Sequence, residues 1–186
     1  AWNVSYEYGP EPLPLLPFSM RGTKTIGSGP SGTLYKYSNT SLTTDAVGLL
    51  TMSSLEWDTY LISLSASSGY DIASSCGVQP EARAAGSSQT TRILVSPYST
   101  NSLLVDVRDS AGVVVTDATV RLQRGAYDTT KTTDACAHTL FSSLSSGTVA
   151  GGNAYSVTVS KSGYQNYTSS AVDVSGTSRI SVVLNP

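Results

Sequence analysis

Short apolar runs, separated by glycine, asparagine, aspartate and serine, recur along the whole chain. The first run is AWNVSYEY, in which Trp2, Val4, Tyr6 and Tyr8 occupy every second position. A period of two places these side chains on one face of an extended segment. Later runs such as TYLISL, TRILV, SLLVDVR, YSVTV and RISVVL are rich in β-branched and aromatic residues, and no window shows a helical period. Dense short strands with frequent turn signals predict an all-β sandwich or barrel.

A proline-rich stretch, GPEPLPLLP, follows the first run. Proline lacks the backbone N–H and fixes φ, so this stretch cannot form a central strand. Residues 1–14 are therefore predicted to be an N-terminal strand followed by a stiff tether.

One sequence pattern occurs twice. TTDAVGLLTMSSL at 43–55 and TTDACAHTLFSSL at 132–144 agree at seven of thirteen positions, with an offset of 132 − 43 = 89. Each copy leads into a strand with a tyrosine, Tyr60 or Tyr155, and then reaches a glycine–tyrosine pair at Tyr70 or Tyr164. The duplication predicts two tandem β-sandwiches, at 15–97 and 98–186, each large enough to bury its own core.

The second copy resembles a carboxypeptidase regulatory-like domain, a prealbumin-like sandwich. The resemblance rests on LLVDVRDSAGVVVTDATVRL, TTDACAHTLFSSL and YSVTVSKSGYQNYTSSAVDVSG. It covers 100–186 well and 15–97 more loosely. The paired arrangement also resembles the exposed part of bacterial pilin-like surface proteins. These resemblances imply two prealbumin-like or Ig-like β-sandwiches, with no catalysis and no cofactor of their own.

Charge and hydropathy narrow the possible partners. The net charge is −2 and only 13% of residues are charged, which argues against binding a phosphate backbone. No apolar run approaches the length of a membrane span. The chain begins at Ala1, which predicts a mature or trimmed chain, so that any targeting or anchoring segment would lie upstream.

The two cysteines, Cys76 and Cys136, fall one in each copy, and Cys136 stands where the first copy has Val47. In an oxidising compartment this favours a disulfide. The alternatives are two separate buried thiols or a catalytic cysteine. The only histidine, His138, lacks an orienting motif, and we expect it to be a solvated side chain on an exposed strand or turn.

The segment LEWDTY contains the strongest candidates for ligand contact. Glu56 and Asp58 flank Trp57, and alternate strand residues face the same way, so the two carboxylates could form a glycosidase pair. Trp57 and Tyr60 could instead contact a sugar ring or a protein partner. The alternative for Trp57 is that it covers one end of the core.

Three triplets, at Asn3, Asn39 and Asn166, match the N-x-[ST] glycosylation pattern. A chain rich in serine and threonine also produces such triplets by chance, so glycosylation is left open.

The sequence is interpreted as a non-catalytic extracellular structural module of a bacterial surface filament or cell-surface protein. It would assemble with neighbouring subunits or an upstream anchor through its N-terminal segment, with Trp2, Val4, Tyr6 and Tyr8 as contacts on a partner strand. That segment would pair with the edge of a sheet, either its own or a neighbour's. The alternative is an adhesion module that binds glycans or host proteins through Trp57 and nearby tyrosines. No metal or nucleic acid is expected as a partner.

Overall fold

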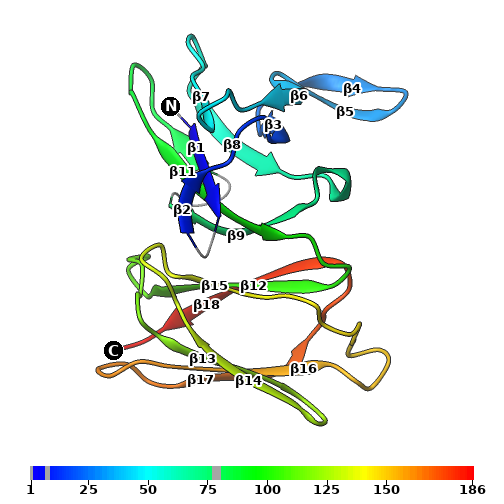
Figure 1. Ribbon diagram of the computed structural model, residues 1–186, viewed down its shortest axis with the longest axis vertical. Helices are drawn as coiled ribbons and strands as arrows, with labels where there is room; N and C mark the ends of the chain where they lie inside the picture. The colour runs from blue at the N-terminus through cyan, green and yellow to red at the C-terminus, as the bar shows by residue number, and fades with distance from the viewer. Residues whose placement is uncertain (1, 7–8, 77–80) are drawn as a thin grey trace. The chain divides into compact units, whose positions relative to one another are not determined.

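Paired strands form nearly all of the regular structure in the computed structural model, which describes residues 2–6, 9–76 and 81–186. In these ranges the only helical element is a short 3-10 turn, Ala66–Ser68. The predicted all-β fold is thus confirmed (Figure 1). The chain divides into two compact units, unit 1 at Ala1–Pro97 and unit 2 at Tyr98–Pro186.

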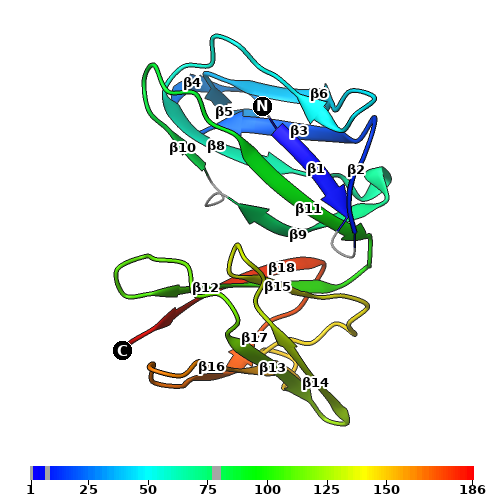
Figure 2. The ribbon, with the colours of Figure 1, turned by 60° about the vertical axis from the view of Figure 1, so that its left-hand side comes forward.

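Unit 1 is built from two main sheets that share one apolar core. One sheet has the order β2–β1–β11–β9, with β7 paired to β1, and the other has the order β10–β8–β3–β6 (Figure 2). The strands are β1 Trp2–Tyr6, β2 Gly9–Pro12, β3 Pro17–Gly22, β6 Ser38–Thr43, β7 Leu49–Leu50, β8 Asp58–Ser63, β9 Tyr70–Cys76, β10 Glu81–Arg83 and β11 Thr91–Pro97. Alternate residues of β3 and β8, such as Met20 and Ile62, pack with Ile93 and Val95 of β11. The two sheets therefore form a sandwich.

Unit 2 is a second sandwich. Its sheets have the orders β15–β12–β18 and β14–β13–β16–β17. The strands are β12 Ser102–Asp109, β13 Thr119–Arg124, β14 Tyr127–Thr132, β15 His138–Phe141, β16 Tyr155–Ser160, β17 Tyr167–Val172 and β18 Thr177–Leu184. Leu103 and Val105 of β12 share a core with Leu122 of β13 and Val157 of β16, all of them fully buried.

The two units share much of their strand topology, although β2 and β9 of unit 1 have no counterpart in the three-stranded sheet of unit 2. In each unit the first strand pairs in parallel with the last, β1 with β11 and β12 with β18. In each unit a strand that follows the TTDA pattern, β7 or β15, pairs antiparallel with that first strand. The facing sheets, β6–β3–β8–β10 and β14–β13–β16–β17, correspond as well. The sequence repeat is therefore a repeat of a whole sandwich.

The units differ most in one connection. In unit 2 a two-residue turn joins β13 to β14, whereas residues 23–37 join β3 to β6 in unit 1. This longer connection contains a separate hairpin of β4 (Thr25–Gly29) and β5 (Gly32–Tyr35), which extends away from the sandwich of unit 1 (Figure 1).

The second threonine of the repeated TTDA pattern has one structural role in both copies. The buried Thr44 hydroxyl donates to Leu13 O at 3.0 Å and accepts from Leu16 N–H at 2.9 Å. Thr133 makes the corresponding bonds in unit 2, to Val115 O at 2.8 Å and from Ala118 N–H at 2.9 Å. The hydroxyl satisfies two backbone groups that would otherwise be buried without partners.

The aspartate of the same pattern closes a tight turn in both copies. A third turn, at Asp109, has the same hydrogen bonds although it lies outside the repeated pattern. Asp45, Asp109 and Asp134 each accept, through Oδ1, the backbone N–H groups two and four residues later at 2.8–2.9 Å. Aspartate favours such turns because its short side chain reaches the backbone just ahead of it.

The residue three positions after each aspartate has a positive φ: 72° at Gly48, 81° at Gly112 and 64° at Ala137.

We expect Gly112→Ala to lower the free energy of unfolding by about 1 kcal/mol, because its new Cβ would meet nothing within 4 Å and only backbone strain opposes it. Gly48→Ala should cost at least about 2 kcal/mol, because its Cβ would also lie 2.9 Å from Leu13 N. Urea denaturation of the two variants tests this order, and equal losses would contradict it.

The N-terminal region contains two short strands, β1 and β2, where the sequence predicted one strand followed by a stiff tether. β1 lies within the first sheet of unit 1, with Trp2, Val4 and Tyr6 in register with Thr91, Ile93 and Val95 of β11. The proline-containing β2 takes the outer position beside β1, where a missing backbone donor is tolerated. Tyr8 lies outside the described residues.

Candidate functional site

The rim of unit 1 beside Trp57 is organised around the carboxylate of Asp58, the first residue of β8. Asp58 is buried, and burial alone would raise its pKa. Hydrogen bonds from Thr23 Oγ1 at 2.8 Å, Thr59 N–H at 2.7 Å and Lys24 N–H at 3.2 Å outweigh burial and hold the pKa below its usual value. A Cβ added at Gly22 would overlap Asp58 Oδ2. Asp58 thus fixes the chain at the start of the β4–β5 connection.

The backbone held by Asp58 positions the Lys24 side chain over Trp57. The Lys24 ammonium lies 3.0 Å from the centroid of the Trp57 ring, which is a cation–π contact. Trp57 is 58% exposed. It therefore does not cover the end of the core, and its ring is available on the surface.

Glu56 is engaged on the other side of Trp57. Lys36 Nζ lies 2.7 Å from its Oε2, and Lys24 Nζ lies 3.8 Å from its Oε1. The hydrogen bond from Lys36 is the main reason that the pKa of Glu56 lies below its usual value. Both carboxyl groups beside Trp57 are consequently ionised at neutral pH.

The hypothesis of a glycosidase pair does not fit this chemistry. Glycoside hydrolysis needs one carboxyl group with a raised pKa to protonate the leaving oxygen. The pKa values of Glu56 and Asp58 are both lowered, and three protein groups already occupy the Asp58 carboxylate. The pair therefore lacks a proton donor. The two carboxylates instead hold neighbouring side chains and backbone groups in place.

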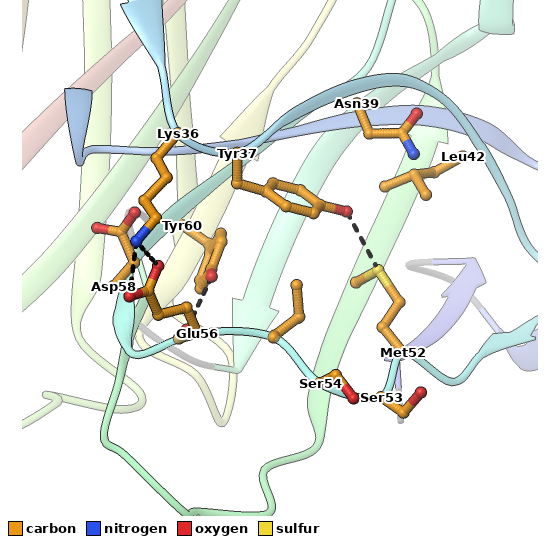
Figure 3. A pocket seen from close by; sticks show the side chains of 11 residues that line it. Lys36, Tyr37, Asn39, Leu42, Met52, Ser53, Ser54, Glu56, Asp58 and Tyr60 are labelled. Carbon is orange, nitrogen blue, oxygen red and sulfur yellow. Dashed lines mark hydrogen bonds and ion pairs between the residues drawn. The ribbon is translucent and has the colours of Figure 1, made fainter. Parts of the chain in front are cut away.

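A groove of about 400 Å³ lies next to this rim. It runs between β6 and the segment 52–56, and Figure 3 shows the side chains that line it. Leu42, Met52 and Leu55 supply apolar surface, and the Tyr37 hydroxyl lies 3.7 Å from the Met52 sulfur. Lys36, Asn39 and Glu56 supply polar groups. The prediction from the sequence missed this groove, because its two walls are separate in the chain.

Tyr60, predicted as a ligand contact, is only 2% exposed. Its ring packs edge-on against Tyr37, with centroids 5.6 Å apart, and its hydroxyl donates to Glu56 O at 2.8 Å. Tyr155 of unit 2 is buried in the same manner, against Tyr127. Tyr60 is thus a core residue of the repeat that also borders the groove.

Both cysteines are disulfide-bonded, and the chain contains no cysteines besides Cys76 and Cys136. Cys76 ends β9, and Cys136 lies in the Asp134 turn that precedes β15. Oxidised cysteines are typical of proteins outside the reducing cytosol.

The prediction that His138 is solvated is wrong. His138 is 1% exposed on β15, in register with Asp106 of β12. Its Nε2 lies 3.6 Å from Asp106 Oδ1 and 3.4 Å from Arg179 Nη2. Burial is the main reason that the pKa of His138 is lowered, although the Asp106 carboxylate opposes this. Pairing with β12 brings His138 into this polar cluster, which the local sequence does not reveal.

The glycosylation triplets fall in different settings. Asn39 lies on β6, where its Oδ1 accepts from Ser41 N–H at 2.9 Å. Asn166 is exposed between β16 and β17, and Asn3 belongs to β1.

Within the described ranges, no group of three or more His, Cys, Asp or Glu residues is placed to hold a metal ion. Among the same residues, no helix is long and apolar enough to cross a membrane.

Neither a protein-family model nor a curated protein matches the sequence. The resemblance to carboxypeptidase regulatory-like domains therefore stays a prediction.

Several solved structures are similar to the chain at low identity. The shaft pilin SpaA of Lactobacillus rhamnosus GG is 14% identical, with 100% of this chain and 96% of that chain covered and a TM-score of 0.35. A C-terminal fragment of the pilus adhesin SpaC from the same organism is 12% identical, with 100% and 95% covered and a TM-score of 0.36. A chain of a cohesin–X-dockerin complex from Acetivibrio cellulolyticus is 14% identical, with 45% and 56% covered and a TM-score of 0.34. This chain thus spans only about half of the last protein, and at these scores the likenesses carry no argument about its function.

Proposed function

We propose that this chain is a non-catalytic structural module of an extracellular surface filament or cell-surface protein. The main support is the combination of two tandem sandwiches with cysteines that are both oxidised. Disulfides persist outside the cytosol, and a sandwich with a filled core offers a stable spacer. The carboxylates that looked most suited to chemistry are tied to Lys36 and to the backbone.

In this proposal the chain joins a neighbouring subunit or an upstream anchor through its N-terminal segment. The backbone of β1 supports this role, because it pairs with β11 on one side and with β2 and β7 on the other. Tension applied before Trp2 would therefore load a strand that is hydrogen-bonded along both edges, and several bonds would have to break together.

Deleting residues 1–8 tests the role of the segment. The deletion uncovers the β11 edge and removes the partner of β2 and β7, so unit 1 should lose stability and native association. Urea denaturation and analytical ultracentrifugation measure the two effects. A synthetic peptide of residues 1–8 should restore stability, whereas a scrambled peptide should not. A truncated chain that is as stable and associates as well as the full chain would refute the proposal.

The alternative function is binding of glycans or host proteins, which the exposed Trp57 ring favours. If it holds, Trp57→Ala should reduce binding on a glycan or protein array at least tenfold, because ring stacking is the main contact. Val183→Ala is the matched control, since Val183 is 52% exposed on unit 2 and should have no effect. Equal binding by Trp57→Ala, or no binding by the parent, would count against this alternative.

A further inference from the structure

Unit 2 closes one side of its sandwich with a lysine. Lys131 on the edge strand β14 donates from Nζ to Leu140 O of β15 at 2.6 Å. The same ammonium lies 5.5 Å from the centroid of the Phe141 ring. This contact, here called the lysine latch, joins the edges of the two sheets of unit 2.

The corresponding residues of unit 1 cannot form the latch. With the offset of 89, Leu42 stands at the position of Lys131, Thr51 at that of Leu140 and Met52 at that of Phe141. β7 is also shorter than β15, with two residues in place of four. The groove of unit 1 opens at this point, and Leu42 and Met52 line it.

The backbone beside the groove is suited to pairing with another strand. β6 is the last strand of its sheet and pairs only with β3 among the described strands. The facing segment 51–57 belongs to no strand. An edge strand presents free N–H and C=O groups on its outer side. On β6 one of these groups, Ser41 N–H, is already held by Asn39 Oδ1.

The side chains around the groove favour an uncharged occupant. Lys36 and Glu56 neutralise each other at 2.7 Å, and the Asp58 carboxylate is held by Thr23 and by backbone N–H groups. Burial raises the pKa of Tyr37, so its hydroxyl remains a donor. In the groove this hydroxyl lies 3.7 Å from the Met52 sulfur, a weak acceptor, and the Asn39 side chain also lies within its hydrogen-bonding reach. A charged ligand would find no unpaired opposite charge in the groove, whereas a peptide carbonyl could accept a hydrogen bond from the Tyr37 hydroxyl.

We propose that this groove binds one extended, uncharged peptide strand of another polypeptide by β-augmentation along β6. The strand would pair with the outer backbone edge of β6 and place an aliphatic side chain on Leu42, Met52 and Leu55. Alternation of side chains in the strand leaves the intervening residues in solvent. The inference is independent of assembly through β1, because it rests on β6, which belongs to the other sheet of unit 1.

The test uses an acetylated, amidated heptapeptide of alternating threonine and isoleucine, titrated into the full chain labelled with 15N. Amide shifts should change at 38–43 and 51–57 and yield a saturable Kd. Leu42→Lys, which rebuilds the lysine latch, should weaken binding at least tenfold. Met52→Phe, which introduces the residue of unit 2, should do the same by filling the groove. Val47→Lys adds the same charge on an exposed turn and should leave the Kd unchanged.

Each result decides the proposal. Absence of saturable shifts in the parent chain, shifts that map elsewhere, or an unchanged Kd in both groove variants would overturn it. A peptide with lysine and glutamate in place of isoleucine, the residues that enter the groove, should bind more weakly, and tighter binding would overturn the assignment of an uncharged occupant. None of these readouts depends on residues 1–8, so the failure of either proposal can be distinguished from that of the other.

Discussion

Replacing Cys76 with serine and Cys136 with valine should lower the free energy of unfolding by roughly 4 kcal/mol. A disulfide between these two oxidised cysteines, as predicted from the sequence, would close a loop of 136 − 76 = 60 residues. Cross-linking a loop of that length removes entropy from the unfolded chain, and the chain-entropy relation gives a value of this size. Valine is the natural choice at 136, because the first copy of the repeat has Val47 in the same turn.

Urea denaturation with and without reductant measures this effect. The reductant should lower the stability of the parent chain to that of the double variant, and it should leave the double variant unchanged. Non-reducing mass spectrometry of secreted protein should find no free thiol. Two free thiols in that material, or equal stability in all four conditions, would show that no such bond stabilises the protein.

Replacing Asp58 with alanine should lower the free energy of unfolding of unit 1 by about 3 kcal/mol. The carboxylate accepts hydrogen bonds from Thr23, Lys24 and Thr59. Its removal leaves these donors without their acceptor beside a buried site, and each unsatisfied donor costs about 1–3 kcal/mol unless water replaces the partner. Unit 2 should be unaffected, because the residues that hold Asp58 all belong to unit 1.

The loss should depend on pH in a defined direction. The pKa of Asp58 is lowered in the folded chain, so its stabilisation is present above the unfolded pKa near 3.8 and disappears as the pH falls through the lower folded value. Parent and variant should therefore converge in stability below pH ~3.8. Gly22→Ala, which crowds the same carboxylate, should also destabilise unit 1. A constant difference between pH 7 and pH 2 would contradict a role for the charge.

Much of the fold could be predicted because strands and turns depend on residues that are close together in the chain. Alternating apolar residues and frequent turn signals indicated strands, and the repeated TTDA and SSL patterns indicated duplication. The structure shows what several residues of the repeated TTDA and SSL patterns do. Asp45 satisfies backbone N–H groups two and four residues later, and Ser54, like Ser143 in the second copy, takes a positive φ of 59° or 55°. Thr44, in contrast, bonds to Leu13 and Leu16, which lie 31 and 28 residues earlier in the chain.

The site could be predicted only in part. Trp57 was a candidate from its residue type, and it is exposed. The partner that covers one face of its ring, Lys24, arrives from a connection 33 residues earlier (57 − 24 = 33). The groove depends on β6 lying opposite the segment 52–56. A comparison of Leu42 with Lys131 through the repeat would have been the one signal in the sequence.

By itself, the sequence determined the all-β character of the protein, the duplication and the identity of its turns, because strands and turns depend on residues close together in the chain. Only the tertiary structure decided that β1 enters a sheet beside the last strand of unit 1, that His138 is buried against Asp106, and that Leu42 and Met52 line one groove. Each of these features depends on pairing between distant segments. The pattern of residues in a strand specifies which of its faces is apolar, but it does not specify which other strand will pair with it.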